Sequence, residues 1–221
     1  MTNTTTAPSE KGSFMNVLSA LRAARLVPVV VLDDVADADA LAGALVTGGL
    51  PVAEVTFRTA AAADSIRVMA ARGDILVGAG TVLTVAQVDQ AVAAGARFVV
   101  SPGLSRAVVE RCGEHDVLAL PGAVTATEVQ AALELGLTTL KFFPAGTCGG
   151  PAAIKALAAP FGDVQFVPTG GVGPKNLGEY LAVPAVVAVG GSWMVPRNRV
   201  KAGDFDGIAG LTADAVALAK S

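Results

Sequence analysis

Residues 118–143 read LALPGAVTATEVQAALELGLTTLKFF and contain a complete strand–helix–strand unit. The apolar run 118–121 ends at a Pro-Gly pair and predicts a short buried strand. Thr125, followed three residues later by Glu128, has the spacing of a capping box and predicts the start of a helix, which a glycine ends eleven residues after Thr125. The apolar run 139–143 predicts the next strand. Because a helix separates the two strands, we expect them to be parallel.

The same unit recurs along the chain, with apolar, β-branched runs about every 20–25 residues. The expected strands cover 27–32, 52–57, 76–80, 98–102, 118–121, 139–143, 165–168 and 186–189. The expected helices include 37–46, 84–94, 125–135, 151–158 and 204–220. Continuous apolar strands separated by helices are typical of a parallel sheet covered on its faces. Eight units predict an α/β fold, an eight-stranded parallel (β/α)8 TIM barrel, with an extra N-terminal helix over 13–24.

An open doubly wound sheet is the alternative fold. Such a sheet normally carries a glycine-rich turn after its first strand. Here that strand ends Leu32-Asp33-Asp34, and we expect the two aspartates to lie in a solvated turn. The barrel is therefore the favoured fold.

Composition limits the classes of function. The chain has 221 residues, of which 52% are hydrophobic and 16% charged, and a net charge of −3 without a basic block, so neither nucleic acid nor a membrane surface is an expected partner. No apolar run of about 18 residues predicts a membrane span. The two cysteines and single histidine have no metal-ligand spacing, so we expect no metal.

The first residues, 1–12, are polar and low in complexity, which predicts a disordered tail before one catalytic domain over 13–221. They lack the basic and apolar regions of a secretory signal. We therefore expect a cytoplasmic protein with reduced thiols.

Lys141 is the most unusual polar residue, because it lies inside the apolar strand 139–143. A buried ammonium is costly unless it is paired or neutralised, and a neutral lysine amine is the nucleophile of Schiff-base chemistry with carbonyl substrates. Glu54, in the strand 52–57, supplies a carboxylate from another strand and predicts a general acid/base partner. We expect a water between them, since direct contact would hold the proton on Lys141. A purely structural ion pair is the alternative.

Two glycine pairs end the seventh and eighth strands, where TIM barrels often bind phosphate through backbone N–H groups. Plain tight turns are the alternative. Together with the neighbouring hydroxyl residues, the pairs predict a phosphorylated substrate. The residues are Thr169, Gly170, Gly171, Gly190, Gly191 and Ser192.

Arg58 shares a strand face with Glu54 by the two-residue period and would face the barrel mouth. Its planar guanidinium suits a carboxylate, and the hydroxyl of Thr81 after the third strand could bind the same group. A 2-oxo acid would use both residues. Arg58 as a surface residue of the next helix is the alternative.

Six motifs occur in order: EVTFRT (54–59), GAGTV (78–82), SPG (101–103), LKFFPA (140–145), PTGG (168–171) and GGSW (190–193). Together they resemble the 2-keto-3-deoxy-6-phosphogluconate (KDPG) aldolase family, also called the 4-hydroxy-2-oxoglutarate (KHG) aldolase family. The resemblance covers roughly residues 26–221. One departure is Gly146, where relatives often have a glutamate.

The resemblance implies a class I, metal-independent lyase without a cofactor, which cleaves KDPG to pyruvate and glyceraldehyde 3-phosphate or KHG to pyruvate and glyoxylate. It implies a cytoplasmic homotrimer of the Entner–Doudoroff route. The implied roles are imine formation for Lys141, proton transfer for Glu54, pyruvate binding for Arg58 and Thr81, and phosphate binding for Gly170, Gly171, Gly191 and Ser192. Phe143, on the strand face of Lys141, would wall the pyruvyl group, with core packing as the alternative.

Two other functions remain open. A phosphate-binding barrel isomerase would share the glycine turns but would not need a buried Lys141. A non-catalytic assembly would keep the barrel and lose the pair of Lys141 and Glu54.

Overall fold

The structure is a computed structural model that describes the backbone of residues 11–221 and the side chains from residue 16 onward. The first helix, α1, spans Lys11–Ala24 and so begins two residues before the expected helix over 13–24. The expected disordered tail over 1–12 otherwise lies outside the described residues.

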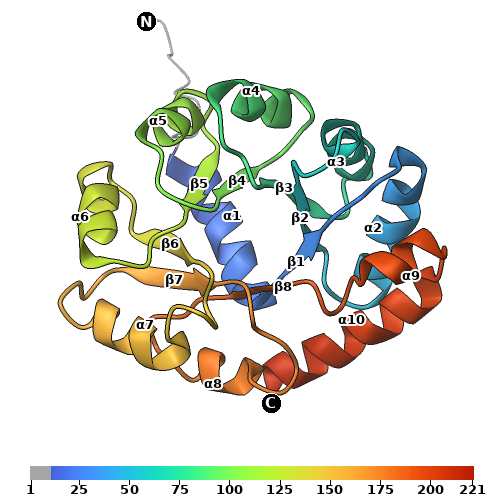
Figure 1. The fold of residues 1–221 in the computed structure, drawn as a ribbon. Helices are drawn as coiled ribbons and strands as arrows, with labels where there is room; N and C mark the ends of the chain where they lie inside the picture. The colour runs from blue at the N-terminus through green and yellow to red at the C-terminus, as the bar shows by residue number, and fades with distance from the viewer. Residues whose placement is uncertain (1–10) are drawn as a thin grey trace, which may run out of the picture.

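Strands and helices alternate along the described part of the chain (Figure 1). The strands are β1 (Leu26–Val30), β2 (Val52–Thr56), β3 (Leu76–Gly80), β4 (Phe98–Ser101), β5 (Leu118–Pro121), β6 (Thr139–Phe142), β7 (Gln165–Pro168) and β8 (Val189–Gly191). The helices after α1 are α2 (Ala38–Thr47), α3 (Ala62–Ala71), α4 (Val85–Ala93), α5 (Arg106–Glu114), α6 (Ala126–Glu134), α7 (Gly150–Ala158), α8 (Leu177–Leu181), α9 (Arg197–Lys201) and α10 (Phe205–Lys220), with a short 3-10 helix η1 (Val35–Asp37) before α2. The predicted α/β class is confirmed.

All strand pairs are parallel, in a six-stranded sheet of order β5-β4-β3-β2-β1-β8 and a two-stranded sheet β6-β7. Single backbone bridges connect the two sheets, at Gly122 with Lys141 and at Thr169 with Gly190. Figure 1 shows the strands curled around a common centre, with α2 to α10 around the outside. The carboxyl ends of parallel strands therefore meet at one end of the sheet.

The hydrophobic core has two parts, because each strand is buried on both faces. The outer part packs the strands against the surrounding helices. The inner part lies inside the ring of strands and is sealed by α1, whose Val17 and Leu21 pack against the inward side chains of the strands. These inward side chains are Val27, Val52, Phe98, Val100, Leu120, Val167 and Ala188.

The expected eighth strand, 186–189, is shifted in the structure to Val189–Gly191. β8 pairs with β1 through Gly190 and Gly191 themselves, so the glycines belong to the strand and do not form a turn after it. A Cβ atom on Gly190 would lie 2.2 Å from Thr169 Oγ1, so glycine lets β8 approach the end of β7. The sequence pattern misplaced this strand because glycine normally weakens a strand.

The expected first strand, 27–32, ends early, at Val30. Side-chain hydroxyls replace strand partners at this point: Thr56 Oγ1 donates to the carbonyl of Val30 at 2.9 Å, and Thr59 Oγ1 donates to the carbonyl of Leu32. The chain therefore leaves the sheet while Leu32 stays fully buried.

Within residues 11–221, no helix combines the length and the apolar character needed to cross a membrane.

Candidate active site

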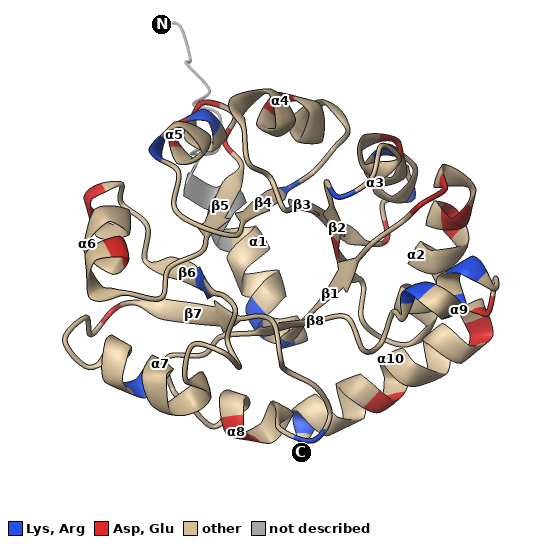
Figure 2. Ribbon diagram, in the orientation of Figure 1, with Lys and Arg blue, Asp and Glu red and all other residues tan. Residues whose placement is uncertain are grey.

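Lys141 lies on β6 with its side chain inside the ring of strands. Figure 2 shows that most charged residues lie on the outer helices and loops, whereas the strands carry few. Lys141 is only 6% exposed, and its Nζ lies 3.4 Å from Oε1 of Glu54, which is 2% exposed. β2 and β6 face each other across the ring (Figure 1), so the two side chains meet in its interior. The two side chains therefore lie in contact, as expected, and their catalytic roles stay predictions.

The expectation of a water between the two groups is wrong. At 3.4 Å, Nζ and Oε1 are in direct contact, because β2 and β6 bring the side chains together from opposite walls. A lone charge in this interior would cost several kcal/mol, whereas the pair shares either two opposite charges or, after proton transfer, none. Lys141 and Glu54 are therefore direct partners, with each side chain the only charged neighbour that the other meets at this distance among the ion pairs of the described residues.

Gly80 on β3 makes room for the Glu54 carboxylate, and sequence reasoning missed this role. A Cβ atom on Gly80 would lie 2.3 Å from Glu54 Oε1. Gly78, two residues earlier on the same face, likewise leaves room for the Phe98 ring. The signal was present in the sequence as two glycines at alternate positions of one strand.

A cavity of about 330 Å³ opens above this pair at the carboxyl ends of the strands. Its lining contains seven of the residues predicted from the sequence: Arg58, Phe143, Thr169, Gly170, Gly171, Gly191 and Ser192. Lys141 and Glu54 line a smaller void of about 10 Å³ just below, and Thr169 borders both spaces. The Phe143 ring, which lines the larger cavity, has its centroid 5.1 Å from Lys141 Nζ.

The turn after β7 presents unused backbone donors to the cavity. Gly170 has φ +90° and Gly171 φ +78°, which is left-handed backbone that favours glycine. Their N–H groups have no acceptor in the described part of the chain, although their carbonyls are bonded, Gly170 O to Gly146 N and Gly171 O to Asn176 Nδ2. Successive free N–H groups in such a turn form an anion-binding concavity.

Gly146, in the loop after β6, runs beside this turn. Its N–H donates to the carbonyl of Gly170 at 2.8 Å, and a Cβ atom on it would lie 3.3 Å from the Cα of Gly171. The small residue therefore leaves the loop after β6 tight against the glycine turn.

Thr81 and Gly190 do not line the cavity. Thr81 follows β3 in a left-handed conformation with φ 57°, which is uncommon for a threonine and marks a constrained position. Gly190 lies under Thr169, where it provides the space described above. The pyruvate-binding role of Thr81 stays a prediction.

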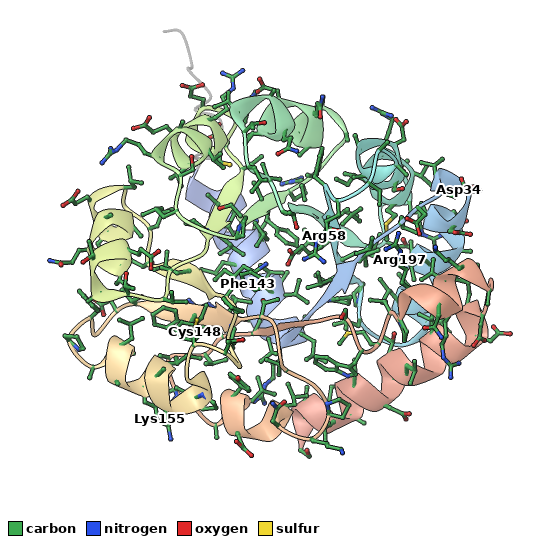
Figure 3. The ribbon with its side chains drawn as sticks, in the orientation of Figure 1. Asp34, Arg58, Phe143, Cys148, Lys155 and Arg197 are labelled. Atoms are coloured by element: carbon green, nitrogen blue, oxygen red, sulfur yellow. The ribbon has the colours of Figure 1, made fainter. Side chains whose placement is uncertain are left out.

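Arg197 also lines the cavity, and sequence reasoning did not select it. Its Nε donates to Oδ2 of Asp33 at 2.8 Å, and its Nη2 donates to Oδ1 of the same carboxylate. Asp33 lies in an exposed bend, as expected, and it also pairs with Lys201, whose Nζ is 3.3 Å away. The hydrogen bond from Arg197 is the main reason that the pKa of Asp33 is lowered. Figure 3 shows Arg58 and Phe143 over the centre of the ring and Arg197 farther out, on the side of α2 and α9.

Outside the residues that line this mouth, the single histidine has a structural partner and the two cysteines are isolated thiols. In the part of the chain that the structure describes, no three His, Cys, Asp or Glu side chains are placed to hold a metal. His115 is half-buried and contacts Asp89 at 2.8 Å, so it joins α4 to α5 on the outside of the molecule. The thiols of Cys112 and Cys148 are both free.

The sequence and the fold of this chain are similar to those of known aldolases. A family model described as "Aldolase: KDPG and KHG aldolase" matches residues 17–211. The 2-dehydro-3-deoxy-phosphogluconate aldolase of Treponema pallidum is 51% identical over 199 residues, which cover 90% of this chain and 95% of the relative.

Two solved structures are also similar over nearly their whole length. The 2-keto-3-deoxy-6-phosphogluconate aldolase of Zymomonas mobilis, solved with 3-phosphoglycerate, gives a TM-score of 0.87 at 42% identity and covers 93% of this chain and 97% of that one. The KDPG aldolase of Legionella pneumophila, with pyruvate captured as a covalent carbinolamine intermediate, gives 0.86 at 39% identity and covers 90% and 97%.

Proposed function

Because the chain belongs to the KDPG and KHG aldolase family, we propose that it is a class I aldolase that cleaves 2-dehydro-3-deoxy-6-phosphogluconate to pyruvate and glyceraldehyde 3-phosphate. One observation carries the proposal: a buried amine, Lys141 Nζ, contacts a buried carboxylate at 3.4 Å directly below a cavity with free backbone donors. The carbinolamine in the Legionella pneumophila enzyme supports Schiff-base chemistry.

The first half of the reaction forms the imine. Lys141 gives one ammonium proton to Glu54, and its neutral amine attacks C2 of the substrate to form a carbinolamine. Glu54 returns this proton to the C2 oxygen and then carries a second proton from the nitrogen to the same oxygen. The oxygen leaves as water, and a protonated imine remains on Lys141. The positive imine nitrogen is an electron sink for the next step.

The second half breaks the carbon–carbon bond. The Glu54 carboxylate removes the proton of the C4 hydroxyl, the C3–C4 electron pair moves toward the imine nitrogen, and glyceraldehyde 3-phosphate leaves. Glu54 then protonates C3 of the enamine, and water hydrolyses the imine to pyruvate and free Lys141. Positioned proton transfer of this kind is worth roughly 10²–10⁴-fold in rate.

The remaining residues are assigned to the two anionic ends of the substrate. Arg58, with Thr81, binds the carboxylate beside C2, and Phe143 walls the pyruvyl carbons. The free N–H groups of Gly170 and Gly171, with Thr169, Gly191 and Ser192, bind the phosphate. Support comes from the cavity, whose lining contains these residues except Thr81.

The pyruvyl half of the substrate is common to a second reaction, the cleavage of 4-hydroxy-2-oxoglutarate to pyruvate and glyoxylate. The family description includes this activity. We expect it at a higher KM, because its substrate leaves the phosphate-binding glycines unused.

The test is pyruvate release from 2-dehydro-3-deoxy-6-phosphogluconate by the purified chain, with and without a metal chelator. We expect turnover that the chelator does not change and that Lys141→Met abolishes while circular dichroism stays unchanged. Turnover that survives Lys141→Met would overturn the proposal.

We also propose the finer fold and assembly. The bridges between the two sheets support a closed eight-stranded (β/α)8 barrel with α1 as a plug. The resemblance supports a cytoplasmic homotrimer in the Entner–Doudoroff route, and the exposed Leu83 and Val85 after β3 offer apolar contact area. Light scattering should then give three times the chain mass of 22.0 kDa.

A further inference from the structure

We propose that Arg197 is a specificity-determining residue that binds the phosphate end of the substrate and, together with Asp33, selects phosphorylated over unphosphorylated 2-oxo acids. This inference rests on the proposed function. It starts from the cavity lining, in which Arg58 and Arg197 are the charged members among the described residues, and both are cationic.

The two arginines match the two charged ends of the proposed substrate. Arg58 lies two residues after the end of β2, the strand of Glu54, and lines the cavity. Arg197 begins α9, six residues after β8, and lines the same cavity as Gly170, Gly171 and Ser192. A carboxylate beside C2 and a phosphate on C6 therefore each have one guanidinium available.

Asp33 holds the Arg197 side chain in place but accepts hydrogen bonds from only some of the N–H groups of Arg197. The guanidinium carries five N–H groups, and the pair with Asp33 engages Nε and Nη2. Both hydrogens of Nη1 stay available to an anion in the cavity. An arginine fixed in this way loses less side-chain entropy when it binds a ligand than a free one would.

The charge of the cluster also favours an anion. Arg197 and Lys201 both contact the single carboxylate of Asp33, so the three groups together carry one net positive charge. A neutral glycine turn then supplies directional N–H donors, and the cluster supplies the charge that a phosphate dianion requires.

The test compares kcat/KM for 2-dehydro-3-deoxy-6-phosphogluconate with kcat/KM for its unphosphorylated counterpart. In Arg197→Gln we expect the ratio of the two values to fall roughly 10-fold or more. The phosphate would lose its hydrogen bonds to the charged guanidinium, and the loss of one such bond corresponds to about this factor. Arg197→Lys should recover part of the ratio. Arg199→Gln is the matched control, because it removes the same charge from the same helix, where Arg199 pairs with Asp204 and does not line the cavity.

Binding of inorganic phosphate, measured by calorimetry, supplies a readout that does not depend on turnover. We expect Arg197→Gln to weaken it by a similar factor and Arg199→Gln to change it less than threefold or so. An unchanged ratio and unchanged phosphate binding in Arg197→Gln would overturn the inference and leave the aldolase function standing. A wild-type chain that cleaves neither substrate would overturn both.

Discussion

At the residue scale, Lys141 and Glu54 depend on each other for their burial. Each side chain is less than a tenth exposed, and removing one partner of such a pair costs about 3–5 kcal/mol, because the other charge is left unpaired. A protein with well-packed apolar residues at both positions is often as stable as one with a buried ion pair, or more stable. Stability alone therefore does not account for the pair. The proposed chemistry at the amine would account for a charged pair at this place in the core.

Glu54→Gln should lower kcat by roughly 10²–10⁴-fold, because the amide cannot accept the proton of Lys141 or of the C4 hydroxyl. Imine formation with pyruvate should slow but stay detectable. Steady-state kinetics and trapping measure the two effects separately, with Glu179→Gln on the exposed face of α8 as the control. Turnover equal to that of the wild type would remove Glu54 from the mechanism.

Gly80→Ala should also lower kcat, although Gly80 contacts no substrate. Its new methyl group would lie 2.3 Å from Glu54 Oε1 and must push the carboxylate away from Lys141. Gly210→Ala on α10 is the control, since a Cβ atom there meets nothing within 4 Å. Steady-state kinetics measure kcat for both variants, and circular dichroism checks that both are folded. Equal kcat in the two would contradict the proposed placement of Glu54.

Cys112 predicts a pH effect on stability. Burial raises the pKa of its thiol from 9.0 to about 12, so the folded state keeps a proton that the unfolded state loses above 9.0. Stability from this group is complete below that pH and falls as pH rises. The stability of the wild type relative to Cys112→Ala should therefore drop by about 1.4 kcal/mol between pH of about 8 and about 10, measured by urea unfolding. A pH-independent difference would show that the thiol is not protected.

At the scale of single elements, α6 shows how well a local signal predicts structure. Thr125 Oγ1 accepts from the N–H of Glu128, and Glu128 Oε2 accepts from the N–H of Thr125 at 2.9 Å, which confirms the capping box expected from the spacing. All atoms of this motif lie within four residues, so the sequence alone determines it.

Thr125→Ala should destabilise the protein by about 1 kcal/mol, because the helix loses its N-cap acceptor. The activity per folded molecule should stay unchanged. Thr127→Ala is the matched control, as the same substitution at an exposed position of α6 without a capping role. Equal urea midpoints for the two variants would argue against the cap as a source of stability.

Elements that depend on distant partners were less predictable. β3, β5 and β7 have the expected bounds, because their apolar runs end at glycine, proline or polar residues. β8 was misplaced by three residues, because its position is set by pairing with β1 and by the close approach of Gly190 to Thr169. Neither contact leaves a local pattern in the sequence.

At the scale of the whole molecule, barrel geometry explains why the site was largely predictable. Strand ends converge at one mouth, so polar residues at those ends could be assigned to one site before any distance was known. The direct contact of Lys141 with Glu54 could not be predicted, since it depends on the width of the ring. Arg197 was missed because its partner, Asp33, lies 164 residues away in the sequence.

The covalent intermediate on Lys141 is the central claim, and reductive trapping tests it most directly. The chain is incubated with pyruvate and sodium borohydride, digested, and mapped by mass spectrometry. A stable adduct of one reduced pyruvyl group on Lys141 is the result that we predict, with no adduct on Lys155 or Lys175. An unmodified chain, or an adduct on another lysine, would contradict the account.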